Sequence, residues 1–214
     1  MGEVTKDTPK ILLDIKGRTV LDWQLEKLKS VNIDEVVLAA GHLSHILKKE
    51  VGEERNGVKL KYAIEKERLG TGGAIKFAWE HLIGSENGPV IILNGDILTT
   101  VPIGKMISSL DANSEGVILG ARVDNASSYG TLVYDKAGHL VDFKEKEGIA
   151  KHGYINGGFY IFNPSAKKYF PDQSSFSIEY DVFPKMKHLY VYQSDDPWID
   201  IGVPERLEWA RRNW

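Results

Sequence analysis

Two short apolar runs, which alternate with helix-like stretches, most constrain how this chain can fold. Residues 36–40 (Val-Val-Leu-Ala-Ala) and 90–93 (Val-Ile-Ile-Leu) are rich in β-branched side chains, as in strands buried on both faces of a parallel sheet. Apolar residues recur at helical spacing over 21–28 and again over 74–82. The alternation predicts βαβ units joined by right-handed crossovers.

The pattern changes after Gly116, where strand-like segments follow one another with turns instead of long helices between them. This part of the chain predicts a mixed or antiparallel region of the sheet, with a hairpin turn at 136–138 in which Asp135 bonds nearby backbone amides. A closing helix is expected over 204–213. The predicted strands lie near 117–123, 131–134, 139–144 and 154–162.

The length of 214 residues suits one α/β domain with a full core. We therefore predict a single domain over residues 1–214, built on a mixed, mainly parallel sheet flanked by helices.

Composition argues against several functional classes. The formal net charge of −3 provides no broad cationic surface for a nucleic-acid backbone, so no polynucleotide partner is expected. No apolar run approaches the roughly 20 residues that a membrane-spanning helix needs, and the N-terminus lacks a basic-then-apolar leader. The chain also has no cysteine, which removes any disulfide framework. We expect a cytoplasmic protein with no membrane partner.

Two carboxylates follow strand-like segments and are candidate metal ligands. Asp96 ends the sequence Asn94-Gly95-Asp96 directly after the run 90–93, where open α/β sheets build their binding crevices. Asp200 lies in the segment 198–202 (Trp-Ile-Asp-Ile-Gly). Mg²⁺ typically takes one or two carboxylates together with substrate phosphates, so the pair suits a nucleotide–metal complex. The alternative is structural, because either aspartate could form an Asx turn or cap a helix.

A glycine-rich segment, residues 69–74 (Leu-Gly-Thr-Gly-Gly-Ala), precedes a predicted helix. Its glycines permit positive φ and a close approach of backbone to a ligand. The segment is neither a Walker loop nor the dinucleotide fingerprint. A simple strand-to-helix turn would explain it as well.

Other residues suit phosphate or sugar binding. Lys10 and Lys146 could meet phosphate oxygens, although each alone could equally form a surface ion pair. In the sequence Asn156-Gly157-Gly158, glycine beside a predicted strand indicates a bulge or a closely approaching ligand. Asn156 and Glu145 could hydrogen-bond sugar hydroxyls.

In this order along the chain, the segments resemble the sugar-1-phosphate nucleotidyltransferase family from Val4 nearly to the C-terminus. Within the family, residues 155–160, 177–179 and 199–204 most resemble enzymes that activate a manno-configured heptose 1-phosphate with GTP. Mannose-1-phosphate guanylyltransferases and muramic-acid-type uridylyltransferases are close relatives. The matching segments are a proline-lysine element (5–10), a base-binding segment (69–74), a metal-binding segment (94–96), sugar-phosphate segments (129–130 and 143–146) and a second metal element (198–202).

The resemblance implies a Rossmann-like nucleotide-diphospho-sugar transferase fold and a reaction of nucleoside triphosphate with sugar 1-phosphate that releases pyrophosphate. Mg²⁺ is the implied cofactor, and a homo-oligomer is compatible with the family. The implied residues are catalytic Lys10, Asp96, Lys146 and Asp200, with Asp96 and Asp200 holding the metal; nucleotide-binding Leu69, Gly70, Thr71, Gly72, Gly73 and Asn94; and sugar-binding Gly130, Glu145, Asn156, Gly157 and Gly158.

Two other functions remain open at this point. A non-catalytic binding or regulatory subunit would keep the fold and lose the chemistry, although such a subunit would not be expected to retain Lys10, Asp96, Lys146 and Asp200 together. A glycosyltransferase would use a similar sheet with a metal carboxylate, but the sequence has no Asp-x-Asp pair at the expected place.

The sequence departs from the family pattern at its start. The family begins with a buried strand and a Gly-Gly-x-Gly-Thr-Arg-Leu loop that wraps the triphosphate, whereas this sequence starts where that loop should be ending. We expect the sheet to lack the family's first strand, and Met1 to correspond to an internal position of the loop. A missing central strand predicts two unpaired sheet edges.

Overall fold

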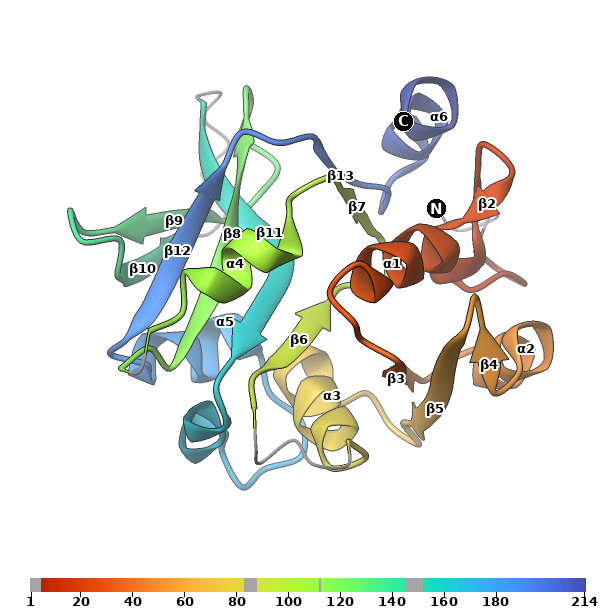
Figure 1. Ribbon diagram of the computed structural model, residues 1–214, viewed down its shortest axis with the longest axis horizontal. Coiled ribbons are helices and arrows are strands. Elements are labelled where there is room, and N and C mark those ends of the chain that lie inside the picture. The colour runs from red at the N-terminus through yellow and green to blue at the C-terminus, as the bar shows by residue number, and fades with distance from the viewer. Residues whose placement is uncertain (1–4, 83–87, 112, 145–151) are drawn as a thin grey trace.

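The computed structural model describes residues 5–82, 88–111, 113–144 and 152–214, and it has a mixed α/β architecture (Figure 1). Its helices are α1 (Val20–Lys29), α2 (Ser44–Val51), α3 (Gly70–Trp79), α4 (Ile103–Ser108), α5 (Ile178–Asp181) and α6 (Pro204–Asn213), with 3-10 turns η1 (Lys10–Leu12), η2 (Pro164–Tyr169) and η3 (Phe183–Lys185). Its strands are β1 (Asp14–Ile15), β2 (Arg18–Thr19), β3 (Glu35–Ala40), β4 (Glu54–Arg55), β5 (Val58–Ile64), β6 (Val90–Leu93), β7 (Ile97–Thr99), β8 (Gly116–Val123), β9 (Thr131–Tyr134), β10 (Leu140–Lys144), β11 (Gly153–Phe162), β12 (Leu189–Ser194) and β13 (Trp198–Asp200).

The helices predicted from apolar spacing are confirmed, and local capping explains where they begin. At the start of α1, the Thr19 hydroxyl accepts from the Asp22 backbone amide at 3.1 Å, and the Asp22 carboxylate accepts from the Thr19 amide at 3.0 Å. This reciprocal capping box satisfies two amides that the first turn leaves unpaired. The closing helix α6 begins at Pro204, a residue suited to the first helical position.

The larger sheet has the order β10-β9-β11-β8-β12, with β6 added to the free part of β11. All four strands predicted after Gly116 are present there, and the hairpin turn between β9 and β10 is confirmed. The Asp135 carboxylate accepts from the backbone amides of Ala137 and His139, each at 2.9 Å. The turn therefore forms by the local hydrogen bonding expected from the sequence.

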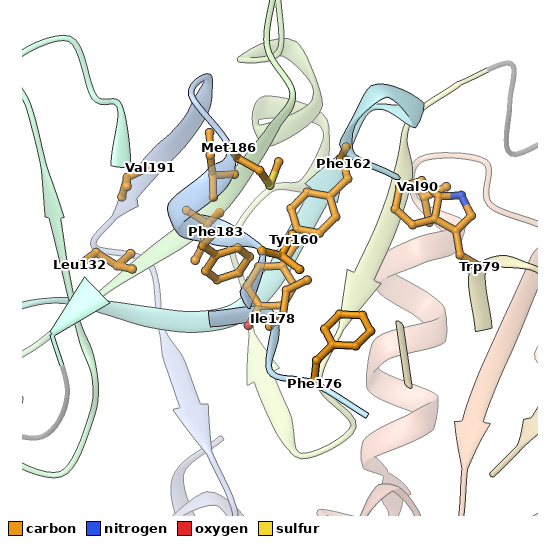
Figure 2. Packing of buried hydrophobic residues seen from close by; sticks show 14 residues of the cluster. Trp79, Val90, Leu132, Tyr160, Phe162, Phe176, Ile178, Phe183, Met186 and Val191 are labelled. Carbon is orange, nitrogen blue, oxygen red and sulfur yellow. The ribbon is translucent and has the colours of Figure 1, made fainter. Parts of the chain in front are cut away.

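Strand β11 is buried on both faces and forms the rigid centre of this sheet. Its alternate side chains enter two different apolar clusters, because successive residues of a strand point to opposite faces. Figure 2 shows Tyr160 and Phe162 stacked beside Phe183, with ring centroids 5.7 Å apart between the two β11 residues. This packing holds the neighbouring residues 156–158 in a fixed place.

The smaller sheet, β3-β5-β4, contains a βαβ unit, because β3 and β5 pair in parallel and are joined through α2; neither β5 nor α2 is among the elements predicted from the sequence. Its edge strand β3 faces β6 of the larger sheet across a cavity of about 1010 Å³. The cavity is lined by residues of both strands and by apolar side chains of α1 and α3. In the described part of the chain β3 and β6 each pair on one side only, as expected for two unpaired edges.

Two details of the predicted fold are wrong. Parallel pairing does not predominate among the described strands, since it is limited to β3 with β5 and β8 with β12. The reason is that β11 runs antiparallel to β6, β8 and β9, so one long strand sets the direction of the larger sheet. Strands β3 and β6 are also only partly buried, because the cavity lies against them.

Candidate functional site

Asp96 and Asp200 are brought together by the pairing of two short strands. Asp96 directly precedes β7, Asp200 ends β13, and these strands pair antiparallel with Asp200 opposite Ile97. The Ile201 amide then donates to the Asp96 carbonyl at 2.9 Å. A Cβ atom placed on Gly202 would lie 2.6 Å from Asp200 Oδ1 and 3.5 Å from Asp96 Oδ2, so both carboxylates converge on that glycine.

Each of these carboxylates has a basic partner. Lys10 Nζ lies 3.0 Å from Asp96 Oδ2, and Arg206 Nη2 lies 3.0 Å from Asp200 Oδ2. The Gly202 amide also donates to Asp200 Oδ1, which is the Asx-turn geometry of the structural alternative. Hydrogen bonds from Gly202 and Arg206 therefore fix the Asp200 carboxylate beside Asp96.

Arg206 was not identified from the sequence. Its Nε donates to the Asp200 carbonyl at 2.5 Å, and its guanidinium lies 5.1 Å from the Tyr129 ring centroid. The only sequence signal is a basic residue in the first turns of a helix that follows a candidate metal ligand. Charge balance at the pair of acids depends on this arginine as well as on Lys10.

Asn94 and the 156–158 segment meet across the edge between β6 and β11. The Asn94 backbone N–H donates to the Gly158 carbonyl at 2.8 Å, and Asn156 Oδ1 accepts from the Gly158 backbone N–H at 3.0 Å. Gly158 has φ +64°, and a Cβ atom there would lie 2.6 Å from Asn94 Nδ2. The predicted bulge is present, since the β11–β8 register shifts between Asn156 and Tyr160.

Gly157 and Gly130 fill places that permit close packing near the site. The Gly157 carbonyl accepts from Trp198 Nε1 at 2.8 Å, which ties β11 to the strand that carries Asp200. A Cβ on Gly130 would lie 2.1 Å from the Phe143 ring. Tyr129, next to Gly130, packs edge-on against Trp198 with centroids 5.6 Å apart.

The glycine-rich segment forms the first turn of α3 and packs against residues 174–178. Cβ atoms on Gly72 and Gly73 would lie 2.4 Å from the Phe176 ring and 2.1 Å from the Ser174 carbonyl oxygen, respectively. These two glycines therefore serve helix packing, as in the simpler turn interpretation. Gly70 also approaches Phe176, where a Cβ atom would lie 2.6 Å from the carbonyl oxygen. Leu69, Gly70 and Thr71 line the cavity as well, so this half of the segment lies where a ligand could reach it.

Part of the predicted set lines the cavity, and the rest contacts this part from β11 and β13. Lys10, Asn94 and Asp96 line the cavity together with residues 69–71, at the ends of β6 and α3. Glu145 and Lys146 lie outside the described residues. The structure thus brings together the proline-lysine element, both acidic segments and the 156–158 bulge.

The donor set fits a hard divalent cation completed by substrate oxygens. No group of three or more metal-ligating side chains occurs within the described ranges. Two converging carboxylates are what Mg²⁺ uses when phosphates and water supply its other ligands.

The described residues include no helix long and apolar enough to cross a bilayer.

Comparison with known proteins adds family and fold relationships. Residues 2–213 match the protein family described as Nucleotidyl transferase. The chain is 34% identical over 208 residues to D-glycero-alpha-D-manno-heptose 1-phosphate guanylyltransferase of Campylobacter jejuni, covering 96% of this chain and 90% of that protein. It is 32% identical over 209 residues to mannose-1-phosphate guanylyltransferase catalytic subunit beta of Xenopus tropicalis, covering 94% of this chain and 58% of that subunit. The chain thus spans under two thirds of the length of this longer relative.

Solved structures show the same architecture. HddC from Yersinia pseudotuberculosis, crystallised in complex with GMP-PN, superposes with a TM-score of 0.82 at 33% identity, over 96% of this chain and 90% of that one. A glucose-1-phosphate thymidylyltransferase described as putative, from Bacillus anthracis, superposes with a TM-score of 0.85 over 99% of this chain and 89% of that one. At 20% identity the second likeness concerns the fold alone.

Proposed function

This chain belongs to the nucleotidyl transferase family, and from that premise we propose that it is a sugar-1-phosphate nucleotidyltransferase. The proposed reaction joins a nucleoside triphosphate to a sugar 1-phosphate and releases pyrophosphate. We propose GTP as the nucleotide and a manno-configured sugar or heptose 1-phosphate as the acceptor. A cytoplasmic location follows from where such phosphorylated substrates are found.

One observation carries this proposal: Asp96 and Asp200 converge on Gly202 beside Lys10. Two acids and a lysine at the end of an open cavity suit a metal–triphosphate complex, since the acids bind the cation and the lysine meets phosphate. A ligand without phosphate groups or a bound metal ion would not need two carboxylates and a lysine at the same place.

In the proposed mechanism, a phosphate oxygen of the sugar 1-phosphate attacks the α-phosphorus of the nucleotide. A new P–O bond forms, the bond from the α-phosphorus to the α–β bridging oxygen breaks in line with it, and pyrophosphate leaves with that electron pair. No side chain acts as nucleophile. Mg²⁺, held by Asp96 and Asp200, would supply charge neutralisation at the phosphates when bound.

The chain's own groups orient the two substrates and offset negative charge. Lys10 sits beside Asp96 and would pair with phosphate oxygens of the bound substrates. Asn94 and residues 69–71 hold the nucleotide, while Asn156 and the close backbone approach at Gly158 position the sugar. Lys146 and Glu145, outside the described residues, keep the phosphate and sugar roles that the family resemblance implies.

The choice of guanine and of a manno-configured acceptor is supported by the names of the relatives. The Campylobacter jejuni relative is named for heptose 1-phosphate, the Xenopus tropicalis relative for mannose 1-phosphate, and the HddC crystal contains GMP-PN. The two relatives' names agree on guanylyl transfer and differ on the sugar.

The large cavity favours a second candidate function, a nucleotide-sugar-binding or regulatory subunit without turnover. The cavity separates β3 from β6 beside the proposed site. Fewer preorganised backbone amides then surround a triphosphate there than would if the two strands were bridged by a paired strand. Such a protein would bind the same ligands through Asn94 and the 156–158 segment and release no pyrophosphate.

Pyrophosphate release in the presence of Mg²⁺ tests the proposal. The 214-residue chain is incubated with each of four nucleoside triphosphates and, in turn, with mannose, heptose, glucose and amino-sugar 1-phosphates. We expect release that requires GTP and a manno-configured sugar phosphate. A chain extended by an apolar strand and a Gly-rich loop is assayed in parallel, and silence in both forms, with nucleotide-sugar binding retained by calorimetry, supports the second function instead.

A further inference from the structure

Gln24 is a buried polar residue of α1 that the proposed mechanism does not use. Its side chain lies in the middle of the helix and is only 8% exposed. Gln24 Nε2 donates to the Asn94 carbonyl at 2.9 Å and to the Ile97 carbonyl at 3.0 Å. Both protons of the side-chain amide therefore bond carbonyls of one short turn, residues 94–97, which is distant from Gln24 in the sequence.

That turn carries two of the residues proposed to bind substrate and metal. Asn94 begins it, Asp96 lies within it, and Ile97 starts β7. The two carbonyls that Gln24 bonds flank Asp96 on either side, so the amide group closes the turn from the α1 side. On the other side, the Ile201 amide holds the Asp96 carbonyl.

We propose that Gln24 is a positioning residue that fixes the 94–97 turn, so that the Asp96 carboxylate faces Asp200 before any cation binds. This inference rests on the proposed function. A buried side-chain amide suits the task because it supplies two donors in one rigid plane. Without it, two carbonyls would be left without these donors in a largely buried place, and the turn would rearrange to reach water.

A purely structural role predicts different behaviour. Leu21, Leu25 and Leu28 of the same helix are buried and attach α1 to the core. A substitution at one of these leucines therefore lowers the stability of the fold without removing a hydrogen bond from the 94–97 turn. The Gln24→Met substitution keeps the length and removes both donors. Leu28→Val, one helical turn away, removes a buried methylene and leaves the donors in place, and it serves as the matched control.

Two measurements are compared across the wild type, Gln24→Met and Leu28→Val. The first is hydrogen–deuterium exchange of the peptide spanning 94–99 in the ligand-free protein. The second is the Mg²⁺ concentration that gives half-maximal pyrophosphate release, determined together with kcat and KM. Loss of a residue that orients a metal ligand typically costs about ten- to a hundredfold in metal affinity or activity.

We expect Gln24→Met to accelerate exchange in that peptide and to raise the half-maximal Mg²⁺ concentration about tenfold, while Leu28→Val changes neither. Unchanged exchange in Gln24→Met would overturn the inference. The inference would also be overturned if both variants kept the wild-type Mg²⁺ requirement and lost kcat equally, because that pattern indicates a general loss of stability. If neither the wild type nor its extended form releases pyrophosphate, the proposed function fails, whereas exchange and Mn²⁺ binding followed by electron paramagnetic resonance still decide whether Gln24 positions Asp96.

Discussion

Replacing Gly158 with alanine tests whether the close approach between β11 and Asn94 is needed at the site. Gly158 has φ +64°, in the left-handed region, where a side chain costs about 1–2 kcal/mol. The added Cβ would also lie 2.6 Å from Asn94 Nδ2 and 2.9 Å from Asn94 Cγ. Asn94 must therefore move its side chain, at a further cost of about 0.5–1.5 kcal/mol for an off-rotamer arrangement.

These contributions predict that Gly158→Ala lowers the free energy of unfolding by about 1.5–3.5 kcal/mol. Gly138→Ala is the matched control, because Gly138 has φ +88° and its nearest neighbour is the Val191 carbonyl oxygen at 4.0 Å. In the control only the backbone strain lowers the free energy of unfolding, by about 1–2 kcal/mol. The difference between the two variants measures the displacement of Asn94.

Urea denaturation followed by circular dichroism measures stability, and pyrophosphate release measures function. We expect Gly158→Ala to lose about tenfold or more in kcat/KM, since a displacement that costs about 1.4 kcal/mol at the transition state corresponds to a factor of ten, while Gly138→Ala keeps the wild-type value. If the two variants lose equal stability and retain equal activity, the close approach at Gly158 has no functional part and the proposed position of Asn94 is wrong.

Three further predictions concern the site, its surroundings and the acid stability of the fold. Asp96→Asn keeps the size of the side chain but removes its charge, so turnover should fall by orders of magnitude with little change in thermal unfolding; near-normal turnover would remove the metal role. Burial alone would raise the pKa of Asp22, but hydrogen bonds from Arg55 and Thr19 outweigh it and hold that pKa well below its usual value. The stabilisation is present above the unfolded-state pKa of about 3.9 and is lost as pH falls below it, so unfolding free energies measured from pH 6 to pH 2 should decline less steeply in Asp22→Asn than in the wild type. An apolar strand of about five or six residues, joined to residue 1 through a Gly-rich loop, should enter the cavity between β3 and β6, raise the melting temperature and abolish binding of a hydrophobic dye. A fused Gly-Ser segment of equal total length should do neither.

Much of the secondary structure is determined by the sequence alone because its causes are local. The Thr19 capping box, the apolar spacing of α1 and the Asp135 turn each involve residues within a few positions of one another. Pro204 and the amphipathic stretch after it define α6 in the same way. Such signals do not depend on the rest of the fold.

The sequence also identified which residue types could bind metal and phosphate, but only the tertiary structure decided how they meet. Asp96 and Asp200 come together because β7 and β13 pair with Asp200 opposite Ile97, a register that no local pattern encodes. The same applies to Arg206, whose ion pair with Asp200 across the turn between β13 and α6 appears only in the folded chain.

Tertiary packing also decided what each glycine lies against. Gly72 and Gly73 face Phe176 and Ser174, whereas Gly158 faces Asn94, and the sequence shows only glycine in all three places. Strand direction was likewise settled by β11, which pairs antiparallel on both sides. The physical reason is common to these cases: helix spacing, caps and turns are set by neighbours in the chain, while convergence, register and close approach are set by contacts between segments that only folding brings together.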